Sequence, residues 1–343
     1  MLRRELTDSL QEALSLSASS RAIAADARAL PTTTTGTGQD WRPKSYAEYM
    51  ATSVPIYAAV RIRSEAIMRT PWEAFQTLPN GARNTLPHTH PLQALLDRPN
   101  EALSGADLRS ATETFLCLYG SAFWSIETSP TGQTELWPLR PDRMAIIPGT
   151  TRTQPFIKGY VYQTTDGALI PYLPSEIEWF HYPNPLDQFS SLSPIAPLRV
   201  TADMGIDANR YNRAIFRNGA IPDYILLAEG SLNQTQVDEF YKRWETRFSG
   251  PDKARRPAIA SDIRDVKMVA LTNRDLEYLG SLRWTIKDTA RAFSVPEVLL
   301  SELEFATLAN MQAMELMFWR NTIIPEAHRL RDRINQGLLP KLG

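Results

Sequence analysis

The sequence predicts an α+β protein, in which hairpins and short helices fill the first half and long helices dominate the second. Two dipeptides carry the β prediction: Asn80-Gly81 and Asp166-Gly167 each separate two strand-like runs, the strongest short-range indication of a β-hairpin. Helical periodicity carries the α prediction over residues 193–219, 275–296 and 310–337. We therefore expect a mixed domain, followed by long helices that flank a smaller α/β module.

Composition excludes several classes of protein. At 343 residues the chain can bury a sizeable core and hold two or three domains. Its formal net charge is −1, so it lacks the basic excess with which general nucleic-acid binders attract phosphates. The single cysteine, Cys117, lies in an apolar run, where we expect it to be buried, and it excludes disulfide frameworks and multi-cysteine zinc sites.

No apolar run reaches 18 residues, and the N-terminus lacks the continuous apolar segment of a secretory signal, so we expect an intracellular protein or one assembled inside a cell. Residues 1–44 predict an arm. Its first part has leucine at every fourth position, as in a short amphipathic helix suited to docking on a partner or on its own domain. Residues 31–44 are polar and aperiodic, which is typical of a disordered or extended segment.

The mixed domain is predicted over residues 45–192. Its first helix spans about 53–69, with Ser53 as N-cap, Pro55 in the first turn, and Arg63 intruding on an otherwise apolar stripe. The hairpin at Asn80-Gly81 and a short helix in "HPLQALLDRPN" follow. A further helix begins after Ser104 and ends at Gly120, where a strand begins, and more strands are predicted in "ELWPLRPDRMAIIP", "KGYVYQTTDGALIPYL" and "EIEWFHYPN".

The second half begins with a long helix over 193–218, opened by Ser193 and Pro194 and ended by Gly219. Its apolar stripe turns polar toward the C-terminal half, as in a helix that leaves its core for water or a subunit interface. Residues 219–274 predict a compact module with the strand "DYILLA", a helix begun by Ser231, the basic loop "GPDKARRP" and a strand pair in "AIASDIRDVKMVAL".

The last third predicts a helix over about 275–296, ended by Pro296, a break at 301–309, and a helix from about Asn310 to Gly337. Pro325 lies inside that last helix, so we expect a kink near 321–325. Met311, Met314 and Met317 recur at helical spacing, which favours packing in a core or an interface over a ligand-binding surface.

Few residues suggest chemistry. His88 and His90 have no third ligand nearby, although a metal site needs three or four, so no metal and no cofactor are expected. The carboxylate pairs Glu176/Glu178 and Glu302/Glu304 would need a pocket that separates their pKa values before they could act as acid and base. No phosphate-binding glycine motif occurs, and no catalytic residue is assigned. This favours a structural or assembly role.

One basic cluster stands out at residues 251–257. It is either a solvated loop or a contact for a protein partner or a DNA backbone, and its cations are Lys253, Arg255 and Arg256.

The order of these elements resembles the portal proteins of tailed bacteriophages, in the HK97-like family. Each phrase is weak alone, but together they follow the family order over about residues 45–340. The phrases are "SVPIYAAVRIRSEAIMRTPWEAF", "DLRSATETFLCLYGSAFWSIE", "PLRPDRMAIIP", "EIEWFHYPNPLDQFSSLSPIAPLR", "IFRNGAIPDYIL", "TIKDTARAFSVPEVLL" and "LANMQAMELMFWRNTIIPEAHRL".

The resemblance implies a ring, usually of twelve subunits, at one capsid vertex of the virion, assembled in the host cytoplasm. Double-stranded DNA passes through such a ring during packaging and ejection. Residues 45–192 would then be the wing, 193–218 and 275–300 the two stem helices, 219–274 the clip, 301–309 the tunnel loop, and 310–343 a kinked helix returning to the wing, with the crown short or absent.

The resemblance also implies partners. They are other copies of the chain, double-stranded DNA, the major capsid protein, the terminase large subunit and the head–tail adaptor, with no membrane contact. Lys253, Arg255 and Arg256 would contact the last two from the clip. The DNA channel would be lined by Ser301, Glu302, Leu303, Glu304, Phe305, Ala306, Thr307 and Leu308. This loop carries two acidic and no basic residues, so it should touch DNA lightly, because like charges repel.

Two other hypotheses remain open. One is an α+β enzyme, for example a metal-dependent hydrolase that uses Glu176, Glu178, His181 and Asp187. The other is a different capsid-associated connector or adaptor, against which the length of the chain and its two long C-terminal helices argue.

Overall fold

The computed structural model describes residues 45–342 apart from residue 131 and the ranges 150–155, 218–223, 229–262, 269–273 and 301–307; within 229–262 only 235, 238, 239 and 242 are described. The chain divides into two compact units. The smaller contains Arg143–Ile177, and the larger contains Tyr46–Asp142 together with Glu178–Gly343. Within the described part, no helix is both long and apolar enough to cross a membrane.

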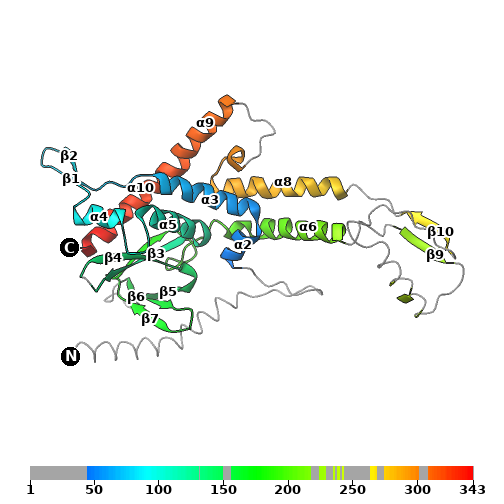
Figure 1. Ribbon diagram of the computed structural model, residues 1–343, viewed down its shortest axis with the longest axis horizontal. Coiled ribbons are helices and arrows are strands. Elements are labelled where there is room, and N and C mark those ends of the chain that lie inside the picture. Colours follow the sequence, from blue (N-terminus) through cyan, green and yellow to red (C-terminus); the bar gives the residue numbers. More distant parts are fainter. Residues whose placement is uncertain are drawn as a thin grey trace. The chain divides into compact units, whose positions relative to one another are not determined.

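Two packed helices organise the larger unit. Helix α3 (Val54–Arg69) lies against α5 (Gly105–Tyr119), and their apolar faces are buried in one core (Figure 1). The predicted start of α3 is confirmed, but a further short helix, α2 (Tyr46–Thr52), precedes it and was not predicted. Ser53, with an extended backbone, separates α2 from α3, and Pro55 lies in the first turn of α3.

Local capping explains the bounds of α5. The Ser104 side chain accepts a hydrogen bond from the Asp107 backbone N–H, and the Asp107 carboxylate accepts one from the Ser104 N–H, so the helix begins with a capping box. Gly120 ends it at φ +71°, a left-handed conformation that glycine adopts without steric cost. Both ends were predicted.

Strand β3 (Ser121–Thr128) follows directly and is central in a three-stranded sheet of order β4-β3-β8, with β4 spanning Thr134–Leu139 and β8 spanning Ile177–His181. Trp124 fixes β3 to α5, because its indole N–H donates to the Thr112 hydroxyl at 2.8 Å, and its ring centroid lies 4.5 Å from that of Phe180 on β8.

Two predicted hairpins form at the expected turns. Strands β1 (Phe75–Thr77) and β2 (Arg83–Thr85) pair across Asn80-Gly81 and are exposed, and α4 (Pro91–Asp97) follows them. In the smaller unit, β5 (Met144–Pro148), β6 (Ile157–Gln163) and β7 (Leu169–Tyr172) form an antiparallel sheet, in which the β6–β7 turn contains Gly167 at φ +88°.

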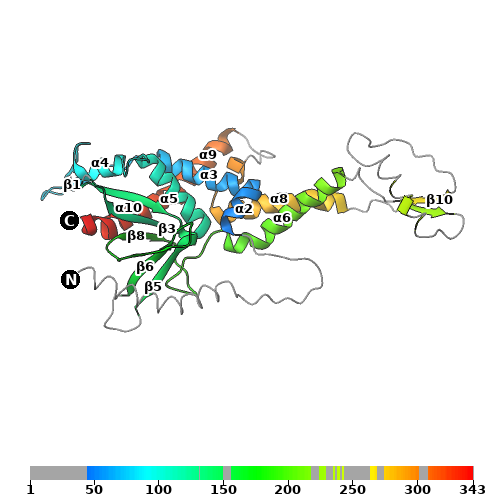
Figure 2. The same ribbon diagram turned by 60° about the horizontal axis from the view of Figure 1, so that its bottom comes forward.

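Helices α6 (Arg199–Arg217) and α8 (Arg274–Phe293) pack along each other, as Figures 1 and 2 both show. The predicted start of α6 at Ser193 is wrong. A 3-10 helix at Ala196–Leu198 precedes α6, and the Ser193 hydroxyl, which accepts from the Ile195 N–H and donates to the Leu118 carbonyl, holds the turn that leads into this 3-10 helix. Strands β9 (Tyr224–Ala228) and β10 (Ile263–Met268) form a separate antiparallel pair.

The C-terminal helix is irregular. After the 3-10 helix Glu297–Leu300, α9 (Leu308–Phe318) leads through a π-helical turn at Trp319–Ile323 into α10 (Ile324–Arg333). This turn lies just before Pro325, where a kink was predicted. A second π-helical turn, Ile334–Leu338, precedes α11 (Leu339–Leu342) and was not predicted.

Candidate functional site

The residues predicted to touch DNA and partners fall mostly outside the described part of the chain. This applies to Ser301–Thr307 of the predicted tunnel loop and to the clip cations Lys253, Arg255 and Arg256. Leu308 is described, and its placement corrects the predicted loop boundary, because it is the first residue of α9. What the structure does describe is how the two sides of this loop are held.

The residues of the hydrolase hypothesis each have a local structural partner. The Glu176 carboxylate accepts from the Leu173 N–H at 2.8 Å, and that of Asp187 accepts from the Phe189 N–H at 2.9 Å. The His181 ring stacks on Trp179 at 4.0 Å, and burial, followed by the nearby Arg333, lowers the pKa of this imidazole.

Glu178 lies fully buried on β8 and serves to hold the C-terminal helix. Its carboxylate forms ion pairs with the Arg333 guanidinium at 2.6 Å and the Lys341 ammonium at 2.7 Å. The chain of the second π-helical turn passes so close that a Cβ on Gly337 would lie 2.2 Å from the Glu178 Oε1 atom. This arrangement compensates the buried charge and fixes the register of the helix against the sheet.

The two histidines considered as a metal pair also have other roles. His88 contacts the Asp97 carboxylate at 2.7 Å, and His90 caps α4, because its Nδ1 atom accepts from the Leu92 N–H. Over the ranges that the structure describes, no three His, Cys, Asp or Glu side chains are grouped so that they could hold a metal ion.

Helix α9 presents an apolar surface to solvent. All residues from Met311 to Met317 are exposed, and the exposed fractions of Leu316 and Met317 reach 68% and 56%. The methionines predicted to pack in a core or an interface therefore do not pack in the core of a single chain. Exposed apolar surface of this extent marks an interaction site in soluble proteins.

The α6–α8 pair also exposes apolar side chains, although fewer than α9 does. Val200 and Met204, one turn apart on α6, are 73% and 60% exposed, and Trp284 on α8 is 60% exposed. Burying such side chains on association is favourable by roughly 25 cal/mol per Å² of apolar surface. We define the exposed apolar side chains of α6, α8 and α9 as the apolar surface set.

A buried polar cluster lies where α3, α5, α10 and the end of α8 meet. Arg63, which intruded on the apolar stripe in the sequence, is only 6% exposed, and its Nε atom donates to the Glu113 carboxylate at 2.8 Å. Its Nη2 atom donates to the Tyr182 hydroxyl at 3.1 Å and to the Glu326 carboxylate at 3.4 Å. We call Arg63, Glu113, Tyr182 and Glu326 the Arg63 cluster.

Burial changes the acidity of this cluster. It raises the pKa of Glu326 from 4.5 to about 7, and the charge of Glu113 adds to this rise, while Arg63 opposes it. Burial likewise raises the pKa of the Cys117 thiol, which contacts Glu113, well above its usual value, so this cysteine stays a neutral, inert thiol. Sequence reasoning missed Glu113 and Glu326, and only the unexpected Arg63 indicated that carboxylates would be needed nearby.

Comparisons with known proteins agree on one family. The chain matches the family described as "Phage portal protein" over residues 55–343. It is 25% identical over 291 residues to the portal protein of Enterobacteria phage HK97, covering 83% of this chain and 66% of that one. It is 24% identical over 300 residues to a probable portal protein of Streptomyces phage phiC31, covering 82% of this chain and 63% of that one.

Among solved structures, the fold resembles a chain in the neck of a native gene transfer agent particle computed with C12 symmetry. The TM-score is 0.60 at 24% identity, and the match covers 86% of this chain and 80% of that one.

Proposed function

Because the chain belongs to the phage portal protein family, we propose that it forms a ring at one capsid vertex and serves as the channel for double-stranded DNA during packaging and ejection. The observation that carries this proposal is the family match over residues 55–343, which includes nearly all of the described structure. The mixed helix and sheet fold supports it, because it resembles that of an HK97-family portal protein from Corynebacterium diphtheriae, with a TM-score of 0.58 at 15% identity.

A ring gives the apolar surface set a purpose. In a closed ring every subunit has two neighbours, so apolar side chains that are exposed on a single chain become buried between copies. The C12 symmetry of the gene transfer agent neck supports twelve as the number of subunits. Val200, Met204, Trp284 and the exposed residues of α9 are the candidates for this contact.

The parts of the ring are assigned as the resemblance implies. We propose 45–192 as the wing, α6 and α8 as the stem, 219–274 as the clip, and 301–307 as the tunnel loop. The support for the last assignment is that α8 ends at Phe293 and α9 begins at Leu308, so the acidic segment between them connects two helix ends.

The clip cations Lys253, Arg255 and Arg256 would dock the terminase large subunit and later the head–tail adaptor, and the wing would contact the major capsid protein. In this proposal the portal neither hydrolyses ATP nor cuts DNA, because the terminase motor does both. The site of action is the portal vertex of the virion.

Sedimentation of the purified full chain, followed by negative-stain imaging, tests the proposal. We expect a closed ring whose mass corresponds to about twelve copies of the 38.7 kDa chain. A chain that stays monomeric at every concentration, also when the other head proteins are present, would overturn it.

A further inference from the structure

The segment between Ser294 and Thr322 is closed at its base by side-chain hydrogen bonds. It contains the 3-10 helix, the undescribed residues 301–307 and α9, and it returns to its starting point, because the Thr322 hydroxyl donates to the Ser294 carbonyl at 2.7 Å. We call residues 294–322 the excursion. The two ends of the excursion are therefore joined by a contact that the structure describes.

The backbone carbonyls at the C-terminal end of α8 accept hydrogen bonds from outside the helix. The last carbonyls of a helix have no partner within the helix and usually turn to water. Here the Ala290 carbonyl accepts from the Val295 N–H at 2.9 Å, the Arg291 carbonyl accepts from the Ser294 N–H at 3.2 Å, and the Phe293 carbonyl accepts from the Arg63 guanidinium at 3.1 Å. A side chain of α3 therefore fixes the point at which the excursion leaves the helix.

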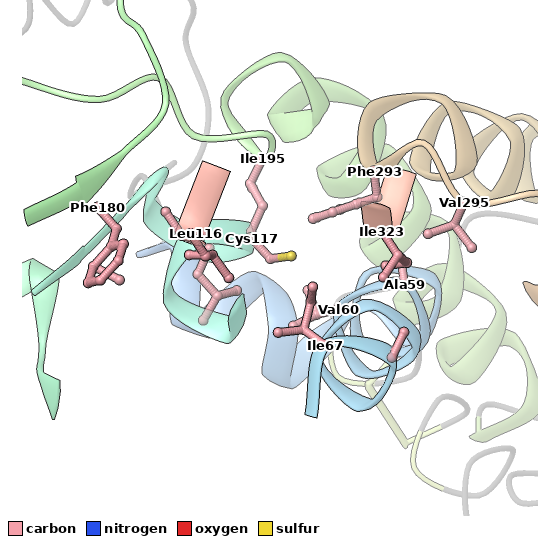
Figure 3. Packing of buried hydrophobic residues seen from close by; sticks show 14 of the residues in the cluster. Ala59, Val60, Ile67, Leu116, Cys117, Phe180, Ile195, Phe293, Val295 and Ile323 are labelled. Atoms are coloured by element: carbon pink, nitrogen blue, oxygen red, sulfur yellow. The ribbon is translucent and has the colours of Figure 1, made fainter. Parts of the chain in front are cut away.

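The backbone at this point is strained. Ser294 has φ +53°, and among the described residues it is the one non-glycine with a positive φ. A left-handed conformation costs a non-glycine residue roughly 1–2 kcal/mol, so it persists only where the surroundings impose it. The surroundings are the hydrogen bonds on either side and the apolar contacts of Phe293, Val295 and Ile323, which Figure 3 shows together with Ala59 of α3.

The Arg63 cluster is better suited to fixing a geometry than to adding stability. A buried ion pair often stabilises a protein no more than apolar side chains of the same volume would, because both charges lose their hydration. A guanidinium, however, directs several donors in one rigid plane. The Arg63 guanidinium donates hydrogen bonds to Glu113 of α5, to Glu326 of α10 and to the last carbonyl of α8. These bonds fix how the three elements meet at α3.

We propose that Arg63 and Thr322 are positioning residues that clamp the base of the excursion onto α3 and thereby set the position of α9. The purpose of this clamp, the placement of the channel loop, rests on the proposed function. Its geometry does not, because it is given by the hydrogen bonds of Arg63 and Thr322. Arg63 holds the outgoing end through Phe293, and Thr322 holds the returning end through Ser294.

A distance measurement within one chain tests the clamp. Cys117 is buried, so spin labels react only with cysteines introduced at exposed positions, and we choose Ala313→Cys on α9 and Arg69→Cys on α3. Labelled chains are assembled with an excess of unlabelled chains, so that pulsed dipolar spectroscopy reports the distance between the two labels of one chain. We expect one narrow distance distribution in the otherwise unchanged protein.

Thr322→Val removes the hydroxyl but keeps the shape of the side chain, and Arg63→Lys keeps the charge but removes the planar donor group. We expect both substitutions to broaden or shift the distribution. Thr322→Ser, which keeps the hydroxyl, should restore the narrow one, and Glu101→Gln, at an exposed position away from the clamp, should leave it unchanged.

An unchanged distribution in Thr322→Val overturns the proposal, even where Arg63→Lys does not fold. A Thr322→Ser variant as broad as Thr322→Val overturns it as well, because the effect would then not depend on the hydroxyl. If the proposed function is wrong, the labelled chain forms no ring, but the distance between its two labels can still be measured. The two proposals can therefore fail independently.

Discussion

Replacing Glu326 by glutamine should make the protein more stable near neutral pH, although the substitution removes a partner of a buried arginine. Glu326 is 5% exposed and lies among charged and neutral polar groups. The charged groups are Arg63 from α3, Glu113 from α5 and Arg329 from α10, and the neutral ones are the Tyr182 hydroxyl after β8 and the Cys117 thiol of α5. Arg63 keeps Glu113 as a counter-ion at 2.8 Å, so the substitution leaves no unpaired buried charge.

The sign follows from the raised pKa. Folding raises the pKa of Glu326 from 4.5 to about 7, so the folded state holds this proton more tightly than the unfolded chain does. Its contribution to stability is complete below about pH 4.5, is lost as the pH rises toward 7, and stays lost above that. At roughly 1.4 kcal/mol per pH unit, the loss is on the order of 3 kcal/mol. Glutamine, which is always neutral, does not undergo it.

The assay compares the free energy of unfolding of the unchanged chain and of Glu326→Gln over this pH range. Protein concentration is held constant, because subunit association contributes to the stability of a ring. We expect the free energy of unfolding of Glu326→Gln, relative to that of the unchanged chain, to rise by about 3 kcal/mol between about pH 4.5 and about pH 7. Glu101→Gln, at an exposed position, is the control and should show no such growth. A difference that is constant with pH, or that favours the unchanged chain more as pH rises, would refute the reasoning.

Four further predictions follow from the described contacts and the proposed function. Gly337→Ala should lower the free energy of unfolding by about 1–3 kcal/mol in denaturant titrations, because its Cβ would clash with the Glu178 carboxylate, whereas exposed Gln336→Ala should not. Leu316→Glu should reduce the ring fraction in sedimentation more than Gln312→Glu on the same helix, and equal ring fractions would remove α9 from the interface. Deleting 302–308 should leave rings intact in sedimentation but impair DNA packaging or retention; undiminished packaging would remove the tunnel-loop assignment. Reversing Arg255 and Arg256 to glutamate should weaken pull-down of terminase or adaptor, and unchanged capture would exclude this loop as the docking site.

Local features of the fold could be predicted from the sequence because each depends on a few adjacent residues. The turns at Gly81 and Gly167, the start of α5 after Ser104 and its end at Gly120 all formed as expected. The start of α6 was wrong for the same kind of reason. Ser193 does hold a local turn, but that turn leads into a 3-10 helix, and the sequence does not show that its hydroxyl also donates to the Leu118 carbonyl on α5.

Contacts between distant residues could not be predicted in this way. Arg63 stood out as a cation in an apolar stripe, but no partner was predicted for it, because Glu113 and Glu326 lie 50 and 263 positions away. Nothing in the local sequence distinguishes these two from solvated glutamates on amphipathic helices. The same holds for Glu178, which was considered as a catalytic carboxylate and instead pairs with Arg333 and Lys341.

Both buried charge clusters attach the same C-terminal helix, and this accounts for the second of its two π-helical turns. An ion pair between buried side chains tolerates little displacement, because a lost contact leaves an unpaired charge out of water. The helix must therefore present Glu326 to Arg63 and, nearly two turns later, Arg333 to Glu178, and Lys341 to Glu178 two turns after that. A regular helix fixes the angles between these positions, whereas a π-helical turn between two of them inserts extra chain and resets their angle. The second π-helical turn lies between Arg333 and Lys341 and so resets the angle between these two partners of Glu178, whereas the first precedes all three charged residues and leaves the angles between them unchanged.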